Sequence, residues 1–141
     1  MVPTALDDRM DQSATIRIGL VGCGRIGLRH VEAVEALGGC ARIAAVCDVD
    51  PGRAATAAVR TGGASCFTDL RAMLAAGGLD AVAVCTPSGL HPAHGRLAAA
   101  AGCHVLCEKP PGLDLASIDT MLQACGDQGT RCFVVLQNRL N

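Results

Sequence analysis

One stretch decides the fold: Ile16-Arg-Ile-Gly-Leu-Val-Gly-Cys-Gly-Arg-Ile-Gly27. Its first half is an apolar run with β-branched residues, typical of a buried strand, and a Gly-x-Gly-x-x-Gly pattern follows at once. In a dinucleotide site Gly22 permits the tight turn off the strand, and Gly24 has no Cβ to hold a pyrophosphate away from the backbone. Gly27 lets the helix that follows lie close to the sheet. The stretch therefore predicts a strand, a phosphate-binding loop and a helix.

Two further features make this common glycine pattern more specific. The amides of Arg25, Ile26 and Gly27 would lie at a helix N-terminus, where backbone dipoles favour the negative charge of phosphates. A second predicted strand ends at Asp48, about 20 residues beyond the last glycine, where a carboxylate can accept hydrogen bonds from an adenosine ribose. Together they predict a dinucleotide cofactor.

The residues around Asp48 favour NAD over NADP. A carboxylate at this position repels the 2′-phosphate of NADP, and Val49 follows it in place of a basic residue that could bind that phosphate. Arg53, one turn into the next predicted helix, keeps NADP open as the less favoured cofactor.

Downstream of this stretch, strand-like and helix-like segments alternate strictly, with short connections between them. The predicted strands span residues 16–21, 42–47, 65–67, 80–85, 104–107 and 131–136. The first, second and fourth predicted helices span residues 25–37, 51–60 and 92–101, the second of them capped by Asp50. The third helix begins after a Thr68 cap, and the last begins after an Asp114 cap. Such alternation predicts an α/β fold, a doubly wound parallel sheet of the Rossmann type with helices on both faces. The loops that follow the strands would then gather at one edge of the sheet, which the cofactor would cross.

Length and composition are consistent with one such domain. The chain has 141 residues, half of them apolar, with no Trp or Tyr and two Phe, so small aliphatic side chains and Cys must build the core. The net charge of −1 gives no electrostatic reason for a nucleic-acid or anionic-membrane partner. We expect a disordered leader over residues 1–15, a dinucleotide-binding domain over residues 16–141, no membrane span and a cytoplasmic location.

Nine cysteines raise the question of a metal site or disulfides. The sequence contains no Cys-x-x-Cys pair, and an odd number of cysteines without a secretion signal argues against a disulfide framework. Most of them fall in apolar strand-like segments, where a thiol packs as a small hydrophobic group. We therefore expect no metal, with Cys47, Cys66, Cys85, Cys107 and Cys132 as packing residues. Cys23 is the exception to examine, because a helix N-terminus beside it could favour a thiolate.

Five motifs, in this order and spacing, resemble the N-terminal half of the glucose–fructose oxidoreductase / inositol dehydrogenase (Gfo/Idh/MocA) family. They are Gly22-Cys-Gly-Arg-Ile-Gly27, Cys47-Asp-Val-Asp-Pro51, Thr86-Pro-Ser-Gly-Leu-His91, Glu108-Lys-Pro110 and Gln137-Asn-Arg139. The third motif, together with Phe133-Val-Val-Leu-Gln-Asn-Arg-Leu-Asn141, looks most like the branch that contains dehydrogenases of UDP-N-acetylglucosaminuronate-type sugars.

The resemblance implies a role for each motif in binding the cofactor. The pyrophosphate would be held by Gly22, Gly24, Arg25, Ile26 and Gly27, and the adenosine ribose by Asp48. The middle and nicotinamide parts of the cofactor would be lined by Thr86, Pro87 and His91. Glu108 would bind the nicotinamide ribose, and Gln137 would lie at the nicotinamide end. Asn138 and Arg139 would lie at the substrate end. Lys109 would stand between cofactor and substrate, aided by the cis Lys-Pro bond that is typical of the family, and would move a proton or orient the reacting hydroxyl.

Taken without the motifs, some of these residues have simpler interpretations. Lys109 is the only lysine in the chain, and a loop lysine is usually a solvated cation. His30 and His94 lie in predicted helices and are expected at the surface or in packing, and His104 receives no role.

Family members carry a second α/β domain, which the resemblance does not cover here. One hypothesis is therefore an oxidoreductase that transfers hydride between NAD and a sugar, nucleotide-sugar or polyol hydroxyl, with these 141 residues inactive by themselves. The other is a stand-alone NAD-binding or sensor module without catalysis. Either could form a homo-oligomer.

Overall fold

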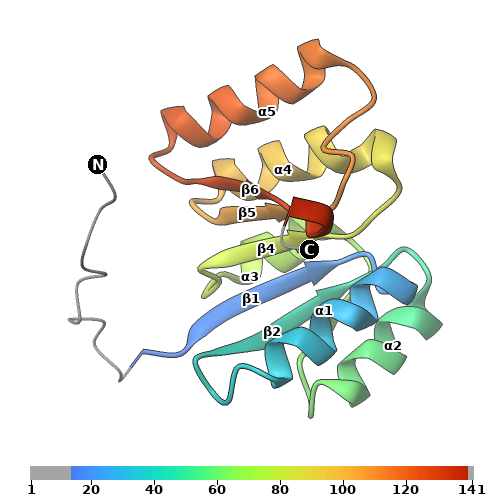
Figure 1. Cartoon of the computed structure of the whole chain (residues 1–141). Helices are drawn as coiled ribbons and strands as arrows, with labels where there is room; N and C mark the ends of the chain where they lie inside the picture. Colours follow the sequence, from blue (N-terminus) through green and yellow to red (C-terminus); the bar gives the residue numbers. More distant parts are fainter. Residues whose placement is uncertain (1–13, 140–141) are drawn as a thin grey trace.

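Six parallel strands alternate with five α-helices in the computed structural model, which describes residues 14–139 (Figure 1). The strands are β1 (Ile16–Val21), β2 (Ala41–Cys47), β3 (Ser65–Phe67), β4 (Ala81–Val84), β5 (His104–Cys107) and β6 (Cys132–Val134). The α-helices are α1 (Arg25–Glu35), α2 (Pro51–Arg60), α3 (Leu70–Ala76), α4 (His91–Ala100) and α5 (Leu115–Asp127), and the 3-10 turns are η1 (Ser88–Leu90) and η2 (Gln137–Arg139). The predicted doubly wound fold is confirmed, whereas most of the predicted leader lies outside the described residues.

Several boundaries differ from the prediction: those of β2, β4 and α4 by one residue at one or both ends, and those of three other elements as follows. The cap of α3 is Asp69 and not Thr68, because the Asp69 carboxylate accepts a hydrogen bond from the Ala72 amide at 3.2 Å. Helix α1 ends two residues early, with Ala36 as its C-cap. Strand β6 is shorter than predicted, since it pairs only with the last three residues of β5 before the chain turns into η2.

The strand order β3-β2-β1-β4-β5-β6 places a reversal between β1 and β4. The chain winds outward from β1 to β3 and then returns to β4 on the other side of β1, so the two sets of crossovers lie on opposite faces of the sheet. Figure 1 shows α1 and α2 together below the sheet and α4 and α5 together above it. The carboxyl ends of β1 and β4 therefore form the switch point at which open α/β sheets bind ligands.

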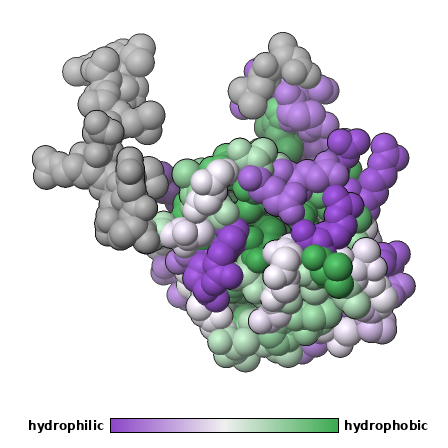
Figure 2. Space-filling view, turned by 90° about the horizontal axis from the view of Figure 1, so that it is seen from below, coloured by the Kyte–Doolittle hydropathy of each residue, from purple (hydrophilic) through white to green (hydrophobic). Residues whose placement is uncertain are grey.

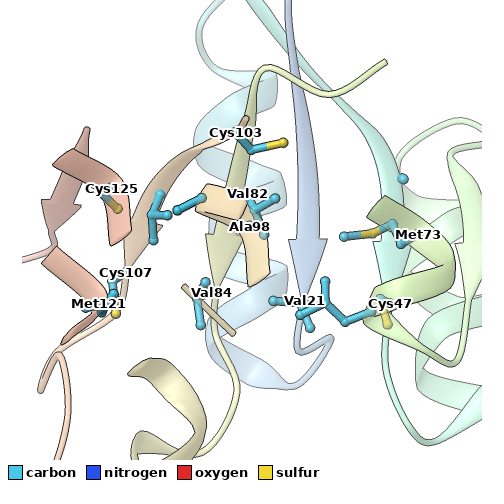
Figure 3. Packing of buried hydrophobic residues seen from close by; sticks show 14 residues of the cluster. Val21, Cys47, Met73, Val82, Val84, Ala98, Cys103, Cys107, Met121 and Cys125 are labelled. Carbon is cyan, nitrogen blue, oxygen red and sulfur yellow. The ribbon is translucent and has the colours of Figure 1, made fainter. Parts of the chain in front are cut away.

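Each face of the sheet has its own apolar core. On one face Met73 of α3, Ala98 of α4 and Met121 of α5 pack on Val82 and other strand residues (Figure 3). On the other face Val31 of α1 and Ala57 of α2 pack on Leu20, Ile43 and Val46. The first of these cores consists mostly of Ala, Val and Cys, whose small side chains let the layers lie close together. A Cβ at Gly95 of α4, for example, would collide with the Met121 side chain of α5.

The cysteines are all free, and five of them are buried. Cys47, Cys103, Cys107 and Cys125 belong to the core drawn in Figure 3, as expected of small hydrophobic groups. Cys66, predicted to pack in the core, is instead exposed, because the short strand β3 lies at the sheet edge.

Several large apolar residues are exposed at the surface. Figure 2 shows apolar (green) residues gathered between polar (purple) ones on the face seen from below. Phe133 of β6 is 52% exposed and Leu136 is 44% exposed, so the last strand and the residues after it leave apolar side chains at the surface. Within residues 14–139, none of the helices has the length and apolar character needed to cross a bilayer.

Candidate dinucleotide-binding site

The glycines of the loop between β1 and α1 meet three different demands. Gly22 has a φ of +91°, and a Cβ there would lie 2.5 Å from the Cys85 carbonyl of the neighbouring strand segment. A Cβ at Gly27 would collide with the backbone oxygen of Gly22, so this glycine closes the helix onto the loop. A Cβ at Gly24 would meet nothing within 4 Å and would fill open space above the loop. The fold itself therefore requires Gly22 and Gly27, whereas Gly24 leaves room for a ligand.

The N-terminus of α1 offers unpaired donors at the same place. Gly24 is the N-cap, and the Leu28 amide donates to the Gly24 carbonyl at 3.0 Å as the first α-helical bond. The amides of the three preceding residues, 25–27, therefore have no acceptor inside the helix. Together with the open space at Gly24, these amides form a cradle that suits the oxygens of a diphosphate.

Asp48 is fixed at the end of β2 by hydrogen bonds to both of its carboxylate oxygens. The Cys23 amide donates to Oδ2 at 2.8 Å, and the Asp50 amide donates to Oδ1 at 2.9 Å. Arg53 Nε lies 3.4 Å from Oδ1. Burial opposes ionisation, but these hydrogen bonds and the Arg53 charge outweigh it and hold the pKa of Asp48 below its ordinary value. Asp48 is therefore an ionised acceptor and also anchors the glycine loop.

A cleft of about 620 Å³ opens at the switch point, and most of the predicted cofactor residues line it. Those that do are Gly22, Gly24, Arg25, Ile26, Asp48, Thr86 and Pro87. The lining residues to which the sequence analysis gave no cofactor role include Thr68, Asp69, Leu70, Arg71, Cys85, Leu90, His94 and Leu97. The N-terminus of α3 and one side of α4 thus form walls of the cleft. The start of α3 reaches the cleft only because the connection from β3 to β4 crosses the sheet. No local pattern in the sequence indicates that this helix would line the cleft.

His94 gives the α4 wall a polar group. Its Nδ1 and the Thr86 hydroxyl oxygen share a hydrogen bond of 2.9 Å across the cleft wall. Burial, and next the proximity of His91, lower the pKa of His94, so its ring is neutral at pH 7. His94 thus has a second role besides the expected packing, because it also orients Thr86.

His91, which the resemblance places beside the middle and nicotinamide parts of the cofactor, is not among the residues that line the cleft. Its side chain is 1% exposed, with Nδ1 at 2.7 Å from the Pro110 carbonyl and Nε2 at 2.6 Å from the Thr86 carbonyl. The ring therefore ties the loop after β4 to the loop after β5. This arrangement depends on two residues distant in sequence, so the motif alone could not reveal it.

The Glu108-Lys109-Pro110 segment follows β5 at the same edge of the sheet. The Lys109–Pro110 peptide bond is cis, as expected. Glu108 Oε1 lies 2.7 Å from Nε2 of His30, a residue of α1 that was expected to have only a surface or packing role. Lys109 is exposed, and so are Gln137, Asn138 and Arg139 of η2, none of which is among the residues lining the cleft. The cleft is therefore lined by residues predicted to bind the diphosphate, the adenosine ribose and the middle of the cofactor, whereas Lys109 and the residues of η2 lie outside its lining.

Cys23 is not the reactive thiol that its position suggested. Burial, followed by the nearby Asp48 charge, raises its pKa to about 12, and its Sγ lies 3.4 Å from the Cys47 carbonyl oxygen. The thiol is therefore protonated and packs beneath the loop.

These features define a dinucleotide-binding Rossmann domain. Residues 16–136 match the family described as "Oxidoreductase family, NAD-binding Rossmann fold" (GFO_IDH_MocA). The chain belongs to this family and is an NAD-binding domain, as the five motifs predicted.

Relatives of known activity are similar over part of their length. D-glucoside 3-dehydrogenase of Escherichia coli is 38% identical over 105 residues, which are 72% of this chain and 29% of the relative. Inositol 2-dehydrogenase of Rhizobium meliloti is 35% identical over 128 residues, 90% of this chain and 38% of the relative. The chain therefore spans well under half the length of either enzyme.

Solved structures agree with this placement. The WlbA dehydrogenase of Bordetella pertussis, in complex with NADH and UDP-GlcNAcA, is 43% identical with a TM-score of 0.87 over 91% of this chain and 39% of that one. The scyllo-inositol dehydrogenase of Lactobacillus casei, with bound NAD(H) and scyllo-inositol, is 31% identical with a TM-score of 0.83 over 91% of this chain and 38% of that one.

Proposed function

We propose that these residues form the cofactor-binding part of an oxidoreductase that transfers hydride between NAD and a hydroxyl of a sugar, nucleotide sugar or polyol. The observation that carries the proposal is the cleft at the switch point, with its open position at Gly24, three free helix amides and an ionised Asp48. Lys109 at the same edge supports chemistry beyond simple binding of a nucleotide.

Each group in the cleft has a defined task in this proposal. The amides of residues 25–27 bind the diphosphate, and Asp48 accepts hydrogen bonds from the adenosine ribose. Because its charge repels a 2′-phosphate, we expect tighter binding of NAD than of NADP. Thr86 and Pro87 line the same cleft as Asp48 and limit where the nucleotide can lie.

The loop after β5 and the turn η2 serve the reacting end. When bound, the nicotinamide ring supplies the hydride acceptor that oxidation of an alcohol requires. Lys109 takes up or returns the hydroxyl proton at Nζ, and Glu108 binds the nicotinamide ribose. Gln137 lies toward the nicotinamide, and Asn138 and Arg139 bind the substrate.

The relatives narrow the substrate class. Their names refer to a glucoside, inositols and, for the 43% identical WlbA dehydrogenase, the nucleotide sugar UDP-GlcNAcA. All of these are polyhydroxylated compounds with secondary hydroxyls. Together with the wording of the Thr86–His91 motif, the WlbA similarity favours a nucleotide sugar.

The 141 residues by themselves should bind NAD and turn over little. The Lys109 end is open to solvent, and positioning of a substrate against a cofactor supplies several kcal/mol of a reaction barrier. We propose that a second domain covers this end in the functional protein.

A domain exchange tests the proposal. Residues 16–139 replace the matching N-terminal part of the Bordetella WlbA dehydrogenase, and reduction of NAD by UDP-GlcNAcA is followed by absorbance. We expect turnover that Lys109→Met abolishes while NADH binding persists. A folded chimera that binds NADH tightly without turnover would instead favour the stand-alone binding module, and one that does not bind NADH would refute the cofactor assignment.

A further inference from the structure

A histidine in the phosphate-binding helix contacts the acid next to Lys109. His30 lies in α1, three residues after Gly27, and its Nε2 is 2.7 Å from Glu108 Oε1. The side chains are 14% and 16% exposed, so the contact is largely shielded from water. Because a carboxylate only accepts hydrogen bonds, Nε2 of His30 is the donor.

The other carboxylate oxygen of Glu108 is also engaged. The Lys109 amide donates to Oε2 at 3.2 Å, and the Glu108 amide donates to the Val84 carbonyl of β4 at 3.0 Å. Backbone and side chain of Glu108 are thus both held, and the His30 bond is the one that reaches it from another layer of the molecule.

We propose that His30 is a positioning residue, which fixes the Glu108 carboxylate at the nicotinamide-ribose end of the site. The inference rests on the proposed function, since Glu108 is assigned to that ribose there. Strand β4 lies in the sheet between β1, which leads into α1, and β5, which leads into Glu108. The pair therefore joins the helix that binds the diphosphate to the loop that carries Lys109, and so sets the distance between the two halves of the cofactor site.

Alternatively, the pair could contribute only to stability. The two roles differ in which ligand they affect. A general loss of stability would change the binding of every nucleotide alike, whereas misplacement of Glu108 would weaken only ligands that reach the second ribose. NADH has this ribose and ADP lacks it, so their affinities separate the two roles.

The test measures NADH and ADP affinities of the full chain by calorimetry for wild type, His30→Leu and His30→Gln. His30→Leu should bind NADH about tenfold more weakly, equivalent to about 1.4 kcal/mol, the magnitude of one hydrogen bond, with ADP affinity unchanged. His30→Gln, which keeps an N–H donor, should recover most of the loss. The control is His104→Leu, which removes a histidine hydrogen-bonded to the Arg131 amide at the opposite end of β5, and should leave both affinities unchanged.

Several outcomes overturn the inference. These are wild-type NADH affinity in His30→Leu, equal losses of NADH and ADP affinity, no recovery in His30→Gln, or wild-type protein that binds NADH no better than ADP. Wild type that binds neither ligand would instead refute the proposed function.

A second measurement needs no variant at His30. In the wild-type protein, imidazole nitrogen chemical shifts should show His30 protonated at Nε2, and Glu108→Gln should change that signal. An unchanged signal would overturn the inference even if His30→Leu failed to fold.

Discussion

At the scale of single residues, glycines that look equivalent in the sequence serve different purposes. Gly27 cannot accept a Cβ because the Gly22 backbone oxygen occupies that space, and backbone cannot rotate away as a side chain can. Gly24 could accept one without any contact inside the protein. Substitutions at Gly27 should therefore unfold the loop, whereas those at Gly24 should affect only the ligand.

Gly24→Val is expected to abolish NADH binding and to keep the fold. Gly24 has extended backbone angles, φ −78° and ψ −163°, which suit a β-branched residue. The melting temperature should change by no more than about 4 °C. Calorimetry with NADH checks the first expectation and a thermal melt the second. Gly126→Ala in α5, where a Cβ also meets open space, is the matched control and should leave NADH affinity unchanged.

Asp48→Ala should lower the free energy of unfolding at pH 7 by about 2 kcal/mol, because two backbone amides lose a charged acceptor. The folded-state pKa of Asp48 lies below its ordinary value of 3.8, so this contribution is complete above that pH and disappears as pH falls through the folded-state pKa. Urea titrations of both proteins should therefore converge in acid. A constant difference between pH 7 and pH 3 would contradict the assignment, and exposed Asp127→Ala serves as control.

At the scale of elements, the order of strands and helices could be predicted because its signals are local. Apolar runs, helix caps and glycine stops lie within a few residues of one another, so even α2 was predicted with its observed bounds. Where two capping residues stand side by side, as at Thr68 and Asp69, the sequence does not distinguish between them.

The site was predictable only where a motif follows a strand. The glycine loop and Asp48 lie where expected because strand ends converge at one edge of the sheet. The contacts of His91 and His30 join segments 19 and 78 residues apart in sequence. Such contacts depend on how layers stack, which no local pattern specifies.

Helix α4 provides a pH-dependent prediction. Folding lowers the pKa of His94 below its ordinary value of 6.5, because the folded protein favours the neutral ring. The free energy of unfolding is therefore unaffected by this group above pH 6.5, and it falls as the pH drops from 6.5 toward the folded-state pKa. His94→Gln, which can still bond to Thr86, should lose less stability between pH 7 and pH 5 than wild type. Urea titrations at several pH values measure this, and parallel curves would contradict it. His104→Gln controls for loss of a histidine outside the cleft.

At the scale of the whole molecule, most of the cysteines lie in or against the apolar cores on the two faces of the sheet. Burial raises the pKa of Cys47 to about 11 and of Cys107 to about 12, so these thiols are both inaccessible and protonated. Cys40 and Cys66 are the exposed ones.

A thiol titration should therefore separate the cysteines into classes. With an aromatic disulfide reagent at pH 8, about two thiols should react rapidly in the native protein, and all nine should react in denaturant. Replacing Cys40 and Cys66 with Ser should remove the rapid phase. Five or more rapid thiols in a protein with a native circular dichroism spectrum would contradict the burial of the core cysteines.

The hydrogen bond between the Cys23 amide and Asp48 has a consequence for redesign of the cofactor preference. Replacing the acid to admit a phosphorylated ribose would at the same time release the turn that grips the diphosphate. Val49, whose side chain is 86% exposed, offers a separate starting point, since a cation could be installed there without disturbing that turn. Retargeting this domain from one dinucleotide to the other should thus begin beside the acid and keep an oxygen acceptor in its place.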